Sequence, residues 1–254
     1  MKNSLLRISK IKKLSMTDKE LEQYYNNLRQ HYLSLPFDEK AIEKSENNFR
    51  IFTIFFNLLA IIKRVKILNE ELIPNEKGLI FVSNHIGSYD QFYINRLLLK
   101  HGYTPHYLVN DKVTKFFFRW NFVFKHVGVV VVNQDSLKSW QWAEEEIIKY
   151  LLYGKSVFIF PEGTRRGENN IGDFKTGVAQ IAQKSGAKIV TMAIKNFEKF
   201  LTGNPIICLG KVIEFDKQEE GAEATERLKT AVLNAYSEIV KYEEKIKNEH
   251  RNRH

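Results

Sequence analysis

The spacing of hydrophobic residues changes at about residue 78. From there, short runs rich in β-branched and aromatic residues alternate with polar and apolar stretches long enough for helices. The predicted strands are 78–83, 106–109, 127–132, 156–160, 188–194 and 206–215, and the predicted helices are 89–100, 113–124, 137–152, 176–185 and 222–248. Continuous apolar strands between helices are typical of an α/β fold with a largely parallel central sheet flanked by helices.

The first part of the chain has a helical pattern instead. Residues 17–35 mix charged and apolar positions, and Pro36 ends the helix that they predict. A second helix is predicted from about residue 48 to residue 68, with apolar residues on nearly every side. We therefore predict an N-terminal helical hairpin, in a membrane-anchoring segment of residues 1–70, before an α/β domain of residues 71–254.

The second predicted helix contains the most apolar run of the chain, residues 51–62. At about 1.5 Å per residue this run covers roughly 18 Å, against a hydrocarbon core of roughly 30 Å, so it is too short to cross a bilayer comfortably. It can be buried inside the protein, or it can lie in a membrane interface with the basic residues 63, 64 and 66 near the lipid headgroups. The first 16 residues contain five basic residues and no acidic one.

Charge and composition narrow the class of partner. The formal net charge of +9 favours nucleic acid, an anionic lipid surface or a phosphorylated substrate. The basic residues are spread along the chain without a nucleic-acid-binding motif, so no nucleic acid is expected. Cys208 is the only cysteine, and the seven histidines lack metal-ligand spacing, so we predict neither an intrachain disulfide nor a metal site.

The first candidate site follows the predicted strand 78–83. Its sequence is SNHIGSYD, in which His85 and Asp90 can fold back into contact across a turn that contains Gly87. An imidazole held by a carboxylate keeps one tautomer, and its other nitrogen can then take a proton from an alcohol. Taken alone, such a pair is more often a helix-capping aspartate beside a hydrogen-bonded loop histidine.

The second candidate site, PEGTRR at 161–166, follows the predicted strand 156–160. Arg165 and Arg166 can clamp phosphate oxygens through charge-assisted hydrogen bonds, and Lys175 adds a third cation just downstream. The alternative is a solvated loop whose arginines meet only water. The chain has neither a Gly-x-Ser-x-Gly elbow nor a glycine-rich phosphate loop, so we do not expect a serine hydrolase or the use of nucleoside triphosphates.

Together, the NHxxxxD motif and the FPEGTR motif about 75 residues later resemble those of the glycerolipid acyltransferase family, over roughly residues 78–195. The resemblance implies that His85 is the catalytic base and Asp90 its partner. It also implies that the acceptor is positioned by Glu162, Gly163, Thr164 and Arg165, with Arg166 and Lys175 as further substrate-binding residues. The implied reaction transfers a fatty acyl group from acyl-CoA or acyl-carrier protein, as cosubstrate and without another cofactor, to a lysolipid hydroxyl. The expected acceptor is 1-acylglycerol-3-phosphate, which would give phosphatidic acid.

Two positions depart from the family's pattern. The arginine that usually ends its second motif is missing from the segment GVVVVNQ, where Asn133 stands, and Thr191 replaces a common proline. Two alternatives therefore stay open: a different lysolipid acceptor, and a non-enzymatic peripheral lipid-binding protein. The implied location is the cytoplasmic face of a membrane, as a peripheral or monotopic protein.

Overall fold

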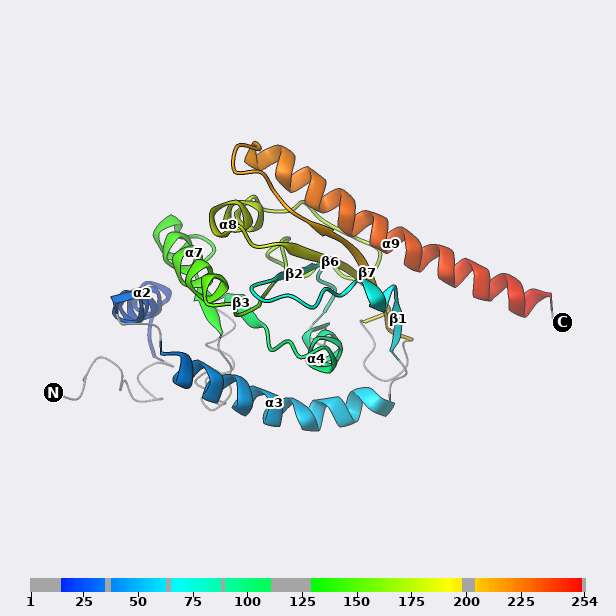
Figure 1. Ribbon diagram of the computed structural model, residues 1–254, viewed down its shortest axis with the longest axis horizontal. Helices are drawn as coiled ribbons and strands as arrows, with labels where there is room; N and C mark the ends of the chain where they lie inside the picture. The colour runs from blue at the N-terminus through cyan, green and yellow to red at the C-terminus, as the bar shows by residue number, and fades with distance from the viewer. Residues whose placement is uncertain are drawn as a thin grey trace.

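The computed structural model describes residues 15–34, 38–62, 65–87, 90–110, 129–197 and 204–252. Within these residues a seven-stranded sheet forms the centre of the molecule, in the order β1-β7-β6-β2-β5-β3-β4 (Figure 1). The strands are β1 (Lys66–Leu68), β2 (Ile80–Ser83), β3 (His106–Asn110), β4 (Val130–Val132), β5 (Val157–Ile159), β6 (Ile189–Lys195) and β7 (Ile206–Ile213). Every neighbouring pair is parallel except β6 and β7, so the predicted α/β fold is confirmed.

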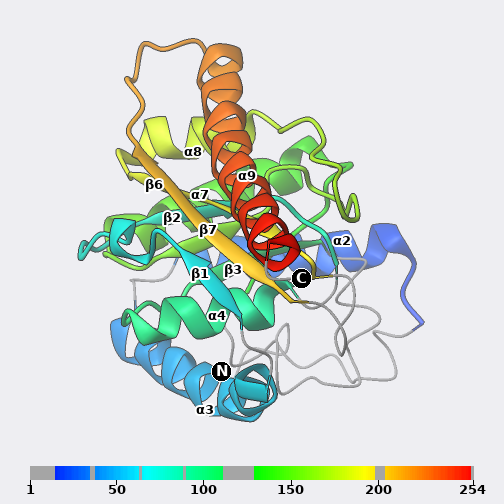
Figure 2. The same cartoon turned by 90° about the vertical axis from the view of Figure 1, so that its right-hand side faces the viewer.

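Helices cover both faces of this sheet. They are α2 (Asp18–Ser34), α3 (Glu39–Ile62), α4 (Asp90–Lys100), α7 (Leu137–Leu152), α8 (Gly177–Ser185) and α9 (Gly221–Arg251), with a short 3-10 helix, η2 (Glu70–Leu72). Helices α7, α8 and α9 lie on one face, and α4 lies on the other with α3 outside it (Figure 1). Helix α9 crosses β6 and β7 and extends past the edge of the sheet (Figures 1 and 2).

The central strands are apolar because both of their faces are covered. In β2, Ile80 and Val82 pack in the core beneath α7, α8 and α9, whereas Phe81 packs in the core beneath α4. All three side chains are fully buried. The side chains of β5 are also buried. Successive residues of a strand point to opposite faces, so a strand covered on both sides has no polar face.

The second N-terminal helix differs from its prediction. Helix α3 begins at Glu39 and ends at Ile62, rather than running from residue 48 to residue 68. The last three residues of the predicted range form β1, which pairs in parallel with β7. A strand of three residues is too short for a pattern of its own, so its pairing partner decides its structure. The proposed boundary at residue 70 stays a prediction, and β1 lies just before it.

The two N-terminal helices pack on different parts of the domain. Helix α2 contacts α7, whereas α3 runs along α4 (Figure 1). Phe49 of α3 is buried, and Arg50 Nε donates a hydrogen bond to Thr104 Oγ1 at 2.8 Å. The side chains of residues 54–62 and the predicted helix 113–124 lie outside the described structure, so the interfacial role of 51–62 stays a prediction. Among the described helices, none combines the length and the apolar character that a bilayer crossing needs.

Candidate active site

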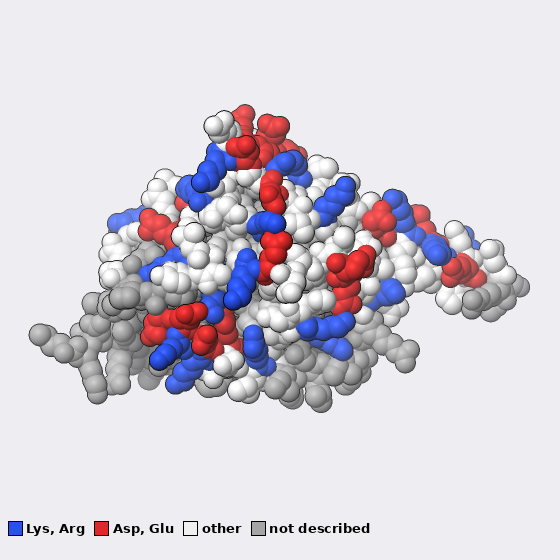
Figure 3. Space-filling view, viewed as in Figure 1, with Lys and Arg blue, Asp and Glu red and all other residues white. Residues whose placement is uncertain are grey.

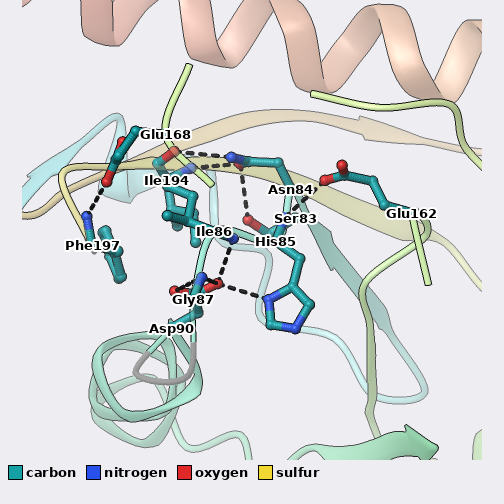
Figure 4. Close-up of polar contacts among 10 residues, drawn as sticks. All are labelled: Ser83, Asn84, His85, Ile86, Gly87, Asp90, Glu162, Glu168, Ile194 and Phe197. Carbon is teal, nitrogen blue, oxygen red and sulfur yellow. Dashed lines mark hydrogen bonds and ion pairs between the residues drawn. The ribbon is translucent and has the colours of Figure 1, made fainter. Parts of the chain in front are cut away.

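His85 follows the carboxyl end of β2, and Asp90 is the first residue of α4. The two side chains meet as predicted, with His85 Nδ1 at 2.8 Å from Asp90 Oδ2 (Figure 4). The same carboxylate accepts the backbone N–H groups of Ile86 at 2.7 Å and of Gly87 at 2.9 Å. Asp90 is completely buried and the His85 side chain is 14% exposed.

This geometry defines what the imidazole can do. Because Nδ1 faces a carboxylate, the neutral ring carries its hydrogen on Nδ1 and keeps a lone pair on Nε2. The two backbone hydrogen bonds, from the turn that precedes α4, hold the Asp90 carboxylate in place. One carboxylate thus fixes both the turn between the two residues and the orientation of the His85 ring.

The loop after β5 holds the backbone of His85 from both sides. Glu162 Oε1 accepts the His85 N–H at 2.8 Å, and the Arg166 N–H donates to the His85 carbonyl at 2.9 Å. Glu162 Oε2 accepts the Gly172 N–H at 2.9 Å, and Arg166 Nε lies 3.9 Å from the same oxygen. The Glu162 side chain is completely buried. Its carboxylate thus joins the two motifs, and its predicted role in binding substrate stays a prediction.

The exposed cations lie on the same loop. Gly163 has a left-handed backbone with φ 66°, and its carbonyl accepts a hydrogen bond from Gln134 Nε2 at 2.9 Å. Lys175 lies so close above Gly163 that a Cβ there would be 3.1 Å from Lys175 Nζ. Thr164 and Arg165 are exposed beside them. Within the described part of the chain, no carboxylate forms an ion pair with Arg165 or Lys175.

The residues at the two departures from the family's pattern have partners elsewhere. Asn133 Nδ2 donates to Glu22 Oε2 of α2 at 3.2 Å. Thr191 Oγ1 donates to the carbonyl of Lys211 at 2.8 Å, next to an irregularity in the pairing of β6 with β7. The FPEGTR loop is contacted by Gln134, the next residue, and the sequence pattern did not single out Gln134.

Two further polar residues, one that ties the first motif to β6 and one that holds the loop after β6, were not predicted. The Asn84 amide pairs with Ile194 of β6, donating to its carbonyl at 3.1 Å and accepting its N–H at 2.8 Å (Figure 4). Glu168 accepts the N–H groups of Asn196 at 3.0 Å and Phe197 at 2.6 Å. Asn84 stands inside the first motif, so the sequence could have indicated its role. Glu168 lies in an ordinary polar loop sequence, and nothing in that sequence indicates its role.

The fold and the site together define an α/β protein with a His–Asp pair at the carboxyl end of a central strand and exposed cations beside it. The family model described as Acyltransferase matches residues 64–195, just over half of the chain. The chain therefore belongs to this acyltransferase family, as the motifs predicted.

Individual relatives agree with the family. A 1-acyl-sn-glycerol-3-phosphate acyltransferase of Borreliella burgdorferi is 27% identical over 170 residues, which are 61% of this chain and 66% of that protein. A probable enzyme of the same name from Mycoplasma pneumoniae is 24% identical over 165 residues, 65% of this chain and 60% of that protein. The matches thus span slightly less than two thirds of these relatives' own length.

One solved structure resembles the whole fold. It is PlsC, the 1-acyl-sn-glycerophosphate acyltransferase of Thermotoga maritima, with a TM-score of 0.56 and 17% sequence identity. The match covers 89% of this chain and 85% of that one. At this identity the likeness shows the fold, which is the predicted helix-flanked sheet with helices before it.

Proposed function

We propose that this protein transfers a fatty acyl group from a thioester to the free hydroxyl of a lysolipid in phospholipid synthesis. The observation that carries the proposal is the buried Asp90 carboxylate, which holds His85 Nδ1 at 2.8 Å and leaves Nε2 as the base. Lipid binding alone needs no such pair, which argues against the non-enzymatic alternative. The names of the relatives support 1-acylglycerol-3-phosphate as the acceptor.

In the proposed mechanism, His85 Nε2 takes the proton of the acceptor hydroxyl as its oxygen attacks the thioester carbonyl. Asp90 stabilises the imidazolium that forms. The tetrahedral intermediate then collapses, and the C–S bond breaks. A thiolate, with an ordinary thiol pKa of about 8.5, leaves much more readily than an alkoxide, so the chemistry requires no covalent enzyme intermediate. His85 returns its proton to the thiolate, and acyl-CoA or acyl-carrier protein serves as the donor.

We assign the acceptor's phosphate to Arg165 and Lys175. Both side chains are exposed beside Gly163, and both carry a charge that suits phosphate oxygens. Arg166 is less suited, because its guanidinium lies above Gly172 and beside the buried Glu162 carboxylate. A different lysolipid acceptor stays open, since Asn133 stands where the family's arginine would be and bonds to Glu22.

We further propose that the protein works at the cytoplasmic face of a membrane, as a peripheral or monotopic protein. The net charge of +9 and the basic first 16 residues favour an anionic lipid surface. Residues 51–62 would add an apolar contact. The lysolipid acceptor is itself a membrane component, so such a location brings the enzyme to its substrate.

The proposed activity is tested with the full-length protein, liposomes, lysophosphatidate and a labelled acyl-CoA or acyl-carrier protein. We expect phosphatidic acid to form, and His85→Ala to lose about 10²–10⁴-fold in turnover, the usual contribution of a positioned base. His101→Ala, at a partly buried ion pair with Glu70 away from this site, is the matched control and should keep its activity. Near-normal turnover in a folded His85→Ala variant would contradict the mechanism. Turnover only with other lysolipids would correct the acceptor.

A further inference from the structure

Phe160 is the one side chain whose ring stacks directly on His85 among the described aromatic contacts. The centroids of the two rings are 3.9 Å apart, and their planes differ by 13°. We propose that Phe160 is a positioning residue, which fixes the plane of the His85 imidazole and stabilises its protonated form. This inference rests on the proposed function, in which His85 is the base.

The other contacts of His85 leave one rotation free. Its backbone is held by Glu162 and Arg166, and Nδ1 is held by Asp90. A single hydrogen bond fixes one edge of the ring but not its tilt, because the terminal torsion of a histidine side chain has a broad energy minimum. A ring lying flat against another ring cannot tilt without separating from it. The stack on Phe160 therefore completes the placement of Nε2.

Phe160 is itself held by a rigid aromatic group. Its ring meets Phe158 edge to face, with centroids 4.9 Å apart and an angle of 61°. Phe158 is completely buried and stacks on Tyr107 of β3 at 5.3 Å. Edge-to-face and offset-stacked pairs are the favoured arrangements of aromatic rings. The ring that supports His85 is thus backed by the core beneath α4.

The stack also affects the chemistry of the base. When His85 takes a proton, the imidazolium lies over the electron-rich face of Phe160, and this attraction is absent for the neutral ring. Asp90 stabilises the same cation from its edge. Phe160 thus favours the state that forms during the proposed reaction, and it shields one face of the imidazole from water. Both effects act on turnover rather than on the binding of the acceptor.

Phe160→Leu tests the inference, because it keeps an apolar side chain and removes the ring. We expect kcat to fall about 10-fold while the acceptor KM changes less than about 2-fold. Phe160→Tyr retains the ring and should restore most of the activity. The control is Phe81→Leu, which removes a fully buried ring of the same core that packs against Tyr103 rather than His85. It should lose stability with little loss of kcat.

An NMR measurement tests the contact without any assay. Protons above an aromatic ring resonate upfield, so the ring protons of His85, assigned by their loss in His85→Gln, should be shifted upfield in the unaltered protein. The shift should disappear in Phe160→Leu and persist in Phe81→Leu. Unshifted His85 signals in the unaltered protein would overturn the inference, even if Phe160→Leu does not fold. So would an equal loss of kcat in both leucine variants. A protein with these shifts but no acyl transfer would overturn the proposed function alone.

Discussion

Arg165, Arg166 and Lys175 are alike in charge, but their surroundings give them different tasks. Arg166 places its guanidinium beside the buried Glu162 carboxylate, whose two oxygens accept N–H groups from His85 and Gly172. A buried carboxylate is costly unless it is hydrogen-bonded and paired, so Arg166 and the backbone together make Glu162 tolerable. Arg165 and Lys175 are exposed and available to an anion.

For Arg165 the prediction concerns the acceptor. Arg165→Ala would remove a charge-assisted hydrogen bond of about 1.5–3 kcal/mol, which corresponds to a loss of roughly 10- to 150-fold in kcat/KM. We expect this loss with lysophosphatidate and a much smaller one with an uncharged monoacylglycerol. Arg251→Ala, at the far end of α9, is the matched control. An equal loss with both acceptors would assign Arg165 to the donor or to the loop's structure.

At the scale of elements, a partly buried carboxylate with two partners holds α3 against the sheet. Glu46 of α3 lies with Oε1 at 3.3 Å from His106 Nε2 and Oε2 at 3.3 Å from Lys155 Nζ. The His106 ring stacks on Tyr150 of α7, with centroids 4.2 Å apart. Burial raises the pKa of Glu46, but the hydrogen bond from His106 and the charge of Lys155 outweigh it, so this pKa lies below its ordinary value of 4.5.

The lowered pKa of Glu46 predicts how the docking of α3 depends on pH. A carboxylate with a lowered pKa in the folded state stabilises it above the pKa of the unfolded state, and this stability is lost as pH falls through the folded value. Glu46→Gln should lower the free energy of unfolding by about 1 kcal/mol at pH 7. Urea unfolding should show this difference shrink below about pH 4.

The control for Glu46 is Glu43→Gln, one turn earlier on the same helix, where the side chain is exposed. It should change the free energy of unfolding by less than about 0.5 kcal/mol at either pH. A difference between Glu46→Gln and the unaltered protein that stays constant from pH 7 to pH 3.5 would mean that the carboxylate's charge does not hold α3.

For the whole molecule, the distribution of charge bears on the membrane proposal. Among the described residues of the face shown in Figure 3, basic and acidic side chains are interspersed. We therefore look for the electrostatic attraction in residues 1–16 and for the apolar contact in residues 51–62, whose sequences differ in kind. Salt screens the electrostatic attraction but does not weaken the apolar contact.

Liposome flotation at low and high salt separates the electrostatic contribution to membrane binding from the apolar one. Deletion of residues 1–16 should weaken binding to anionic liposomes, by about 1 kcal/mol for each basic residue that lies near the surface, and leave binding to neutral liposomes. Replacement of Phe52, Phe55 and Phe56 by Ser should weaken both. Activity on a detergent-dispersed short-chain acceptor should survive the deletion, since His85 and Asp90 lie outside it. Full-length protein that stays in the aqueous fraction at both salt concentrations would contradict a membrane location.

Much of this architecture was predictable because it depends on local patterns. The apolar runs of β2, β5 and β6 predicted buried parallel strands, and the five-residue separation of His85 and Asp90 predicted their contact across a turn. The predicted start and end of α3 were wrong. The short β1 and the contacts of Glu46 and Phe49 depend on partners that are distant in the sequence.

By itself, then, the sequence determined the class of fold, the family and the His85–Asp90 pair. Only the tertiary structure decided that Glu162 binds the backbone of His85, that Gln134 rather than Asn133 reaches Gly163, and that Phe160 lies on the imidazole. The physical reason is that these partners come from different strands, whose ends meet because β2 and β5 pair in parallel with Ile80 beside Val157. Such contacts depend on the register of the sheet, and strands buried on both faces, as β2 and β5 are, have no alternation of apolar and polar residues that would fix this register locally.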